Sequence, residues 1–184
     1  MKGVKVLSYK RRTLSPDSPY AAVAALLMIL SVGLRFASFA INFGSMSLLK
    51  FAVDYLLPVV FCILMTVVLL SRRNNLMPTI LPLILYFASA ALGTIDLEPG
   101  MCAVCAGVYA ILPAVYALTV SGVLGSRTLL FLSCGGVITF DLIIKTSIMN
   151  PPADFAAFLP SLSAALVTLS VMIEARGMRR GRLY

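Results

Sequence analysis

Five charged residues stand inside apolar stretches of this sequence, where groups that could do chemistry are otherwise scarce. Asp141 and Lys145 are four residues apart. Lys50 and Asp54 have the same spacing, and Arg35 stands alone. A spacing of four places both members of a pair on one face of a helix. An unpaired charge in hydrocarbon costs about 2.5–3.5 kcal/mol on insertion scales, so such residues face a bundle interior or a polar cavity. The chemistry that these groups offer is the binding of a polar solute.

Other polar and aromatic residues recur at helical spacing near these charges. Three helix faces carry them: Ser31, Arg35, Ser38 and Asn42; Tyr86, Ser89 and Gly93; and Cys102, Cys105, Tyr109, Pro113 and Tyr116. Because polar faces avoid lipid, we expect them to converge on one interior space. The predicted pocket residues are Arg35, Asn42, Asp54, Tyr86, Tyr109, Tyr116, Asp141 and Lys145.

The five charges also share one predicted depth. At the rise of an α-helix, all of them fall within about 12 Å of the outer surface, and none is expected in the inner half. Arg35 can pair with Asp54, and the cluster as a whole contains three cations and two anions. The unmatched positive charge suits a carboxylate or a phosphate-bearing solute. In the alternative, Lys50 extends to the surface, and Arg35 with Asp54 only locks two helices together.

The elements that must position these residues are membrane-spanning helices. The chain has 184 residues, 60% of them hydrophobic and 12% charged, whereas about 25% of a soluble protein is charged. Apolar runs of 20 or more residues match the thickness of a bilayer. We predict an all-α polytopic membrane protein, a bundle of six transmembrane helices: Tyr20 to Ile41, Leu49 to Ser71, Leu76 to Ile95, Met101 to Leu124, Arg127 to Met149 and Phe155 to Ala175.

Basic residues predict how these spans are oriented. Twelve of the 15 lysines and arginines flank the span ends on the side of the termini. The positive-inside rule therefore places both termini in the cytoplasm. We expect a basic arm over residues 1–19, the membrane domain over 20–175 and a basic tail over 176–184. The arm and tail could also touch anionic lipid. The net charge of +8 is a topology signal, and no nucleic-acid partner is expected because no basic residue alternates with aromatics in a soluble module.

Catalytic and metal chemistry find little support in the residue types. The chain has no histidine and four cysteines, and no hydrolase, phosphate-loop or paired-carboxylate motif occurs. We expect no catalytic residue, no metal site and no cofactor. Cys102-x-x-Cys105 lies at the outer edge of its span, where a membrane thiol oxidoreductase could place such a pair. In the other interpretation these are two small buried residues.

The architecture as a whole resembles a known family. Six spans in under 200 residues, with Ala21-x-x-x-Ala25 early in the first one, are similar to the S components of energy-coupling-factor transporters. The resemblance implies a bacterial substrate-binding subunit in which Ala21 and Ala25 contact a transmembrane coupling subunit that works with ATPases. It also implies that the loop "NFGSMSL" acts as a lid. The chain departs from the family in lacking Trp and His, which often line vitamin pockets, and in its longer cytoplasmic arm.

These observations lead to one functional expectation with two alternatives. We expect a multi-pass protein of the bacterial cytoplasmic membrane that captures a small polar solute from outside, with an anion favoured by the charge balance. Active uptake would need a partner ATPase, because the chain carries no nucleotide motif. One alternative is a non-transporting subunit or assembly factor of a membrane complex. The second alternative is a thiol oxidoreductase that uses Cys102 and Cys105.

Overall fold

The computed structural model describes most of the chain and shows it to be helical. Described are residues 19–42, 47–70, 76–95, 97–121, 123–124, 127–149 and 155–177, without the side chains of residues 42, 76–79, 146–149 and 155–157. The elements are α1 (Pro19–Asn42), α2 (Leu48–Phe51), η2 (Ala52–Leu56), α3 (Leu57–Leu70), α4 (Leu76–Leu92), α5 (Pro99–Val120), α6 (Thr128–Thr139), η3 (Phe140–Met149) and α7 (Phe155–Gly177). The segments η2 and η3 are π-helical and continue into α3 and out of α6 without a break.

The chain is helical as predicted, and several of its helices are long and apolar enough to cross a membrane, which is compatible with a multi-pass protein. Among the described residues, five stretches are long and apolar enough: Pro19–Ile41, Leu48–Leu70, Pro99–Val120, Thr128–Lys145 and Phe158–Gly177. The helix of the predicted third span, α4, begins at Leu76 as expected and ends at Leu92 in place of Ile95. It ends early because the chain turns at Gly93, where the hydroxyl of Thr94 donates 2.7 Å to the Ala91 carbonyl.

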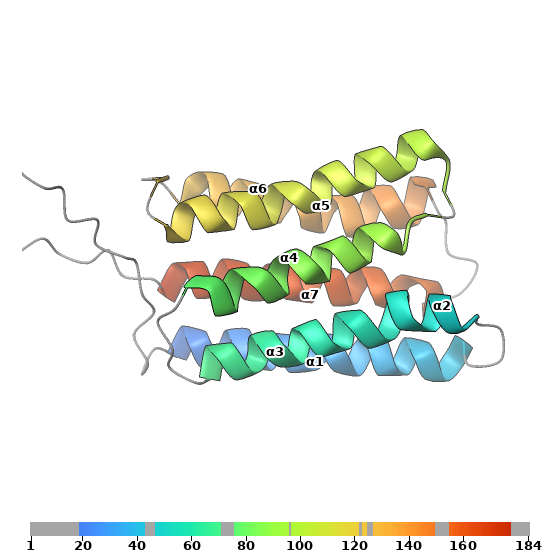
Figure 1. Ribbon diagram of the computed structural model, residues 1–184, viewed down its shortest axis with the longest axis horizontal. Coiled ribbons are helices and arrows are strands. Elements are labelled where there is room, and N and C mark those ends of the chain that lie inside the picture. The colour runs from blue at the N-terminus through green and yellow to red at the C-terminus, as the bar shows by residue number, and fades with distance from the viewer. Residues whose placement is uncertain are drawn as a thin grey trace, which may run out of the picture.

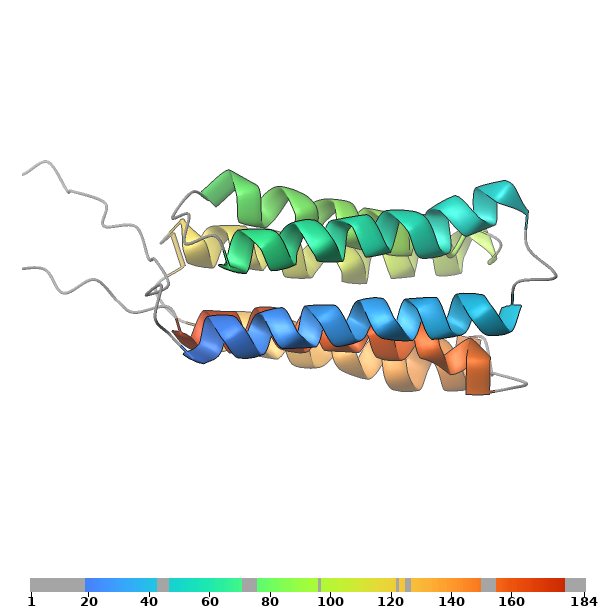
Figure 2. The ribbon, with the colours of Figure 1, turned by 90° about the horizontal axis from the view of Figure 1, so that it is seen from below.

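The helices lie side by side in an elongated bundle (Figures 1 and 2). Packing runs from α1 to α3, α4, α5, α6 and α7, and α7 returns to α1, so the helices close around one core. Large aliphatic side chains such as Leu26, Val67 and Leu132 are exposed on the outside, as lipid contact requires. We call the end where α1 begins and α7 ends the terminal end, and the opposite end the pocket end.

Small residues bring α1 and α7 close together. Ala21 is 8% exposed and Ala25 3% exposed, and the hydroxyl of Ser170 donates 2.8 Å to the Ala24 carbonyl. Small side chains allow this approach between membrane helices. The pair Ala21 and Ala25, which the family resemblance assigns to a partner subunit, therefore lies inside the bundle and not on its outer face.

Enlarging Ala25 should destabilise the bundle more than enlarging its exposed neighbour. Ala25→Leu places extra methyl groups in a close-packed helix interface, where overpacking costs about 1–3 kcal/mol. Ala22→Leu is the matched control, because Ala22 is exposed on the same turn of α1. Thermal unfolding in mild detergent should show a lower midpoint for the first variant only. Equal midpoints would contradict the packing of α1 described above.

Candidate functional site

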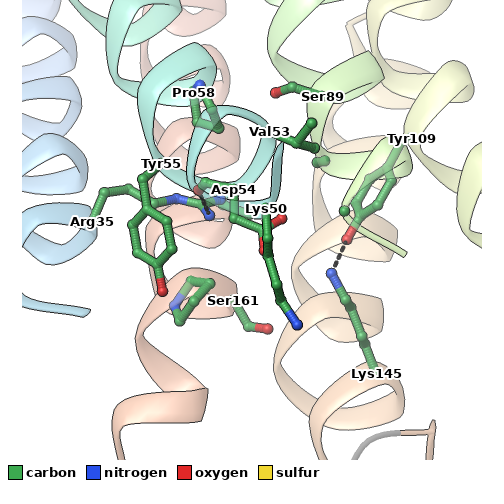
Figure 3. Close-up of a pocket in the computed structure, with 14 residues that line it drawn as sticks. Arg35, Lys50, Val53, Asp54, Tyr55, Pro58, Ser89, Tyr109, Lys145 and Ser161 are labelled. Carbon is green, nitrogen blue, oxygen red and sulfur yellow. Dashed lines mark hydrogen bonds between the residues drawn. The ribbon is translucent and has the colours of Figure 1, made fainter. Parts of the chain in front are cut away.

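A polar cavity of about 180 Å³ opens at the pocket end of the bundle (Figure 3). It draws residues from α1, α2, η2, α3, α4, α5, η3 and α7, so nearly the whole bundle positions it. Its polar and charged lining consists of Arg35, Lys50, Asp54, Tyr55, Ser89, Tyr109, Lys145 and Ser161. All five charges that the sequence singled out lie at this end, and four of them line the cavity.

Arg35 is the most strongly anchored side chain of the cavity wall. Its Nε donates 3.1 Å to the Ser163 hydroxyl, and its Nη1 donates 2.8 Å to the main-chain carbonyl of Asp54. Its Nη2 lies 3.4 Å from the Tyr86 hydroxyl. These three acceptors are neutral oxygens on three different helical columns. They hold the guanidinium in place without cancelling its positive charge.

A proline explains why the carbonyl of Asp54 needs an outside donor. In an α-helix, residue 58 would supply the N–H that bonds the carbonyl of residue 54, but Pro58 has no N–H. The chain is π-helical just before this point, with the Leu57 N–H bonded to the Ala52 carbonyl. Proline in a membrane helix is tolerated where neighbouring groups satisfy the released carbonyl. Arg35 does so here.

The polar stripe of α1 continues on both sides of Arg35. The hydroxyls of Ser31 and Ser163 lie 2.7 Å apart, and each also bonds the other residue's main-chain carbonyl. The Ser38 hydroxyl lies 3.2 Å from the Tyr55 hydroxyl. The structure thus turns Ser31, Arg35 and Ser38 inward on one buried face. Asn42 ends the predicted stripe, but its side chain lies outside the described residues.

Tyr109 connects the two charges of η3. Its hydroxyl donates 2.5 Å to Asp141 Oδ1 and accepts a 3.1 Å hydrogen bond from Lys145 Nζ. The same Nζ lies 5.5 Å from the centre of the Tyr109 ring, a cation–π contact. Asp141 is fully buried, so this carboxylate lies behind the cavity wall. The pair that looked self-contained in sequence is bridged by a tyrosine from α5.

The cavity wall carries more positive than negative charge. Arg35, Lys50 and Lys145 line it together with one carboxylate, Asp54. Asp141 adds a second carboxylate one layer behind. Counted together, the cluster holds three cations and two anions, as the charge balance of the sequence suggested. Figure 3 shows Lys50 and Lys145 extending into the same space.

Two predicted pocket tyrosines lie away from the open cavity. Tyr86 is buried behind Arg35 and packs edge-on against Phe87, with ring centres 5.3 Å apart. Tyr116 lies about two turns from Tyr109 along α5, towards the terminal end. There it meets Glu174 of α7, which is not among the predicted site residues. Tyr116 is therefore no part of the cavity.

Glu174 also corrects the prediction that no charge lies in the inner half. It is 4% exposed and stands three residues before the end of α7. The expected span to Ala175 contained it, but it was not among the charges assigned to the membrane. The structure continues α7 to Gly177 and turns this side chain inward. An acidic residue within an apolar run was the signal that could have identified it.

The cysteines do not form an exposed redox pair in this structure. All four are free thiols, and Cys105 is fully buried. The thiol of Cys102 lies 2.9 Å from the Thr94 carbonyl and 3.3 Å from that of Leu97, where it caps the turn before α5. Among the described residues, no group of three potential metal ligands comes together.

Removing the Arg35 side chain should destabilise the protein strongly. Arg35→Met leaves the Asp54 carbonyl without its donor and removes the bonds to Ser163 and Tyr86, and a buried group left unsatisfied costs about 1–3 kcal/mol. Lys50→Met is the control, because Lys50 is exposed at the rim of the same cavity. Unfolding in detergent should place the Arg35 variant well below the Lys50 variant. Similar losses would show that the guanidinium bonds contribute little.

The chain was also compared with known proteins. No protein family, no curated protein and no solved structure matches it. The cavity and the charges around it are therefore the features from which a function can be inferred.

Proposed function

We propose that this protein binds a small anionic solute in the cavity at the pocket end and takes part in its uptake across the bacterial cytoplasmic membrane. The observation that carries the proposal is the cavity wall, where Arg35, Lys50 and Lys145 meet a single lining carboxylate. Charges inside a membrane protein are costly and mark solute pathways or paired groups. An anion would complete the charge balance of this cluster.

The cavity has the chemistry to hold a carboxylate or a phosphate. Arg35 is held in place by neutral acceptors, so its charge acts on the cavity without further ordering. Lys145 and Lys50 add ammonium donors, and Ser89 and Ser161 add hydroxyls. A volume of about 180 Å³ is below the roughly 300–1,000 Å³ of pockets for drug-sized ligands. The proposed solute is therefore small.

The proposed setting follows from the charges at the helix ends. Both termini lie in the cytoplasm by the positive-inside rule, so the pocket end faces outward. The protein captures the solute from outside and depends on a partner for energy. Following the resemblance to S components of energy-coupling-factor transporters, that partner is a transmembrane coupling subunit with its ATPases. Membrane lipid surrounds the bundle.

One observation favours a second candidate function, a non-transporting subunit of a membrane complex. The bonds of Arg35 tie α1 to η2, α4 and α7, which is what a structural lock between helices requires. In that case the charges hold the bundle together and no solute binds. The two candidates differ in one measurable property, the response of the purified protein to anions.

Anions should stabilise the purified protein. We expect the unfolding midpoint to rise with a small carboxylate such as succinate or with inorganic phosphate, and not with an uncharged analogue. A ligand at 100 times its Kd stabilises a protein by about 2.7 kcal/mol. Lys145→Gln should weaken the response at least tenfold in apparent affinity, whereas Arg176→Gln, exposed at the terminal end, should leave it unchanged. No response to any anion, with no solute co-purifying by mass spectrometry, would favour the structural subunit.

Gly93 provides a second test, because it lets the Asp54 carboxylate sit in the cavity wall. A Cβ at position 93 would lie 2.6 Å from Asp54 Oδ1. Gly93→Ala should therefore move this carboxylate and change anion affinity severalfold, with little effect on the unfolding midpoint, since a side-chain end can shift. Gly107→Ala is the control, because its Cβ would meet nothing within 4 Å. Identical anion responses in both variants would exclude Asp54 from the binding site.

A further inference from the structure

Glu174 is a buried acidic residue that the proposed solute site does not use. It lies in the last turn of α7, at the terminal end, far along the bundle from the cavity. Its side chain is 4% exposed, and its neighbours Val171 and Ala175 are fully buried. The carboxyl group therefore points into the apolar core of the bundle and not towards lipid or water.

Tyr116 of α5 is the group that Glu174 meets. Tyr116 is fully buried, and its hydroxyl forms no hydrogen bond of good geometry within the described residues. The Glu174 carboxyl interacts with this hydroxyl. A buried hydroxyl needs a hydrogen-bond partner, and the Glu174 carboxyl is a polar group beside it that can serve as one.

The charged groups near this end of α7 do not neutralise Glu174. From α6, the Arg127 guanidinium donates 3.2 Å to the Arg176 main-chain carbonyl, and that bond is exposed. Arg176 of α7 is exposed. Tyr20, a titratable residue at the start of α1, is 44% exposed. In the part of the chain that the structure describes, Glu174 has no ion-pair partner.

A carboxylate in this position has one inexpensive way to lose its charge. Burying an uncompensated ion costs far more than burying a neutral, hydrogen-bonded group. Intramembrane carboxyl groups commonly serve as proton sites for this reason. We propose that Glu174 and Tyr116 form a proton-binding site at the terminal end of the bundle. One O–H bond forms on the carboxylate as one O–H bond of a hydronium ion in the adjoining aqueous phase breaks, and a water molecule is left.

The site shares its two helices with the cavity. The helix α5 carries Tyr109 at the cavity and Tyr116 at the proton site, and α7 carries Ser161 and Glu174 in the same way. The proton site is nevertheless independent of any solute, since none of its groups lines the cavity. Its test can therefore fail while the proposed function stands, and the reverse also holds.

Infrared spectroscopy of the full-length protein in lipid bilayers at neutral pH tests the site. A glutamate in water has a pKa of about 4.3 and is ionised under these conditions. The spectrum of the wild type minus that of Glu174→Gln should show the C=O stretch of a protonated carboxyl group. The same subtraction with Glu98→Gln, a variant at the exposed residue just before α5, is the matched control. Carboxylate bands in the Glu174 difference would overturn the proposal.

A second variant keeps the test decisive if Glu174→Gln does not fold. Tyr116→Phe removes the hydroxyl and leaves the rest of the ring in place. Removing the hydroxyl that lies beside a protonated carboxyl should shift the frequency of its C=O stretch. An unchanged C=O region in Tyr116→Phe would contradict the pairing of the two groups.

Discussion

The hydrogen bond from Arg35 to the main-chain carbonyl of Asp54 is the interaction on which the pocket end depends. Pro58 has no N–H to donate to that carbonyl, and the Arg35 guanidinium donates to it. The remaining donors of the same guanidinium reach Ser163 and Tyr86, so one side chain ties α1 to three other parts of the bundle. A cation becomes part of the helix framework, and its charge remains available to the cavity.

The other charges at this end follow the same rule that each must have a partner. Lys145 and Asp141 both bond the Tyr109 hydroxyl, so a neutral group on α5 holds them in register. The charged side chains of η2 and η3 occupy π-helical segments, which often occur at functional sites. Irregular backbone and buried charge thus coincide at one end of an otherwise regular bundle. The cavity of the proposed anion site is lined by charged residues of both π-helical segments, Asp54 and Lys145.

Sequence patterns could predict the elements and part of the site. Apolar runs identified the helices, and the spacing of Ser31, Arg35 and Ser38 identified a face of α1 that the structure turns inward. The π-helical turns could not be predicted, because they depend on which carbonyls neighbouring helices can satisfy. The bridge from Tyr109 to Asp141 also joins residues far apart in the chain. Glu174 lies near the end of an apolar run, and the run alone does not show that its side chain turns into the core.

A double-mutant cycle tests most directly whether Arg35 replaces the missing N–H of Pro58. Pro58→Ala restores a main-chain donor for the Asp54 carbonyl, so that carbonyl no longer needs the guanidinium. If Arg35 replaces the missing N–H, Arg35→Met should lower the free energy of unfolding by about 1 kcal/mol less in the Pro58→Ala background than in the wild type. Equal losses of unfolding free energy in the two backgrounds would show that Arg35 and Pro58 act independently, and would contradict the role given to Arg35.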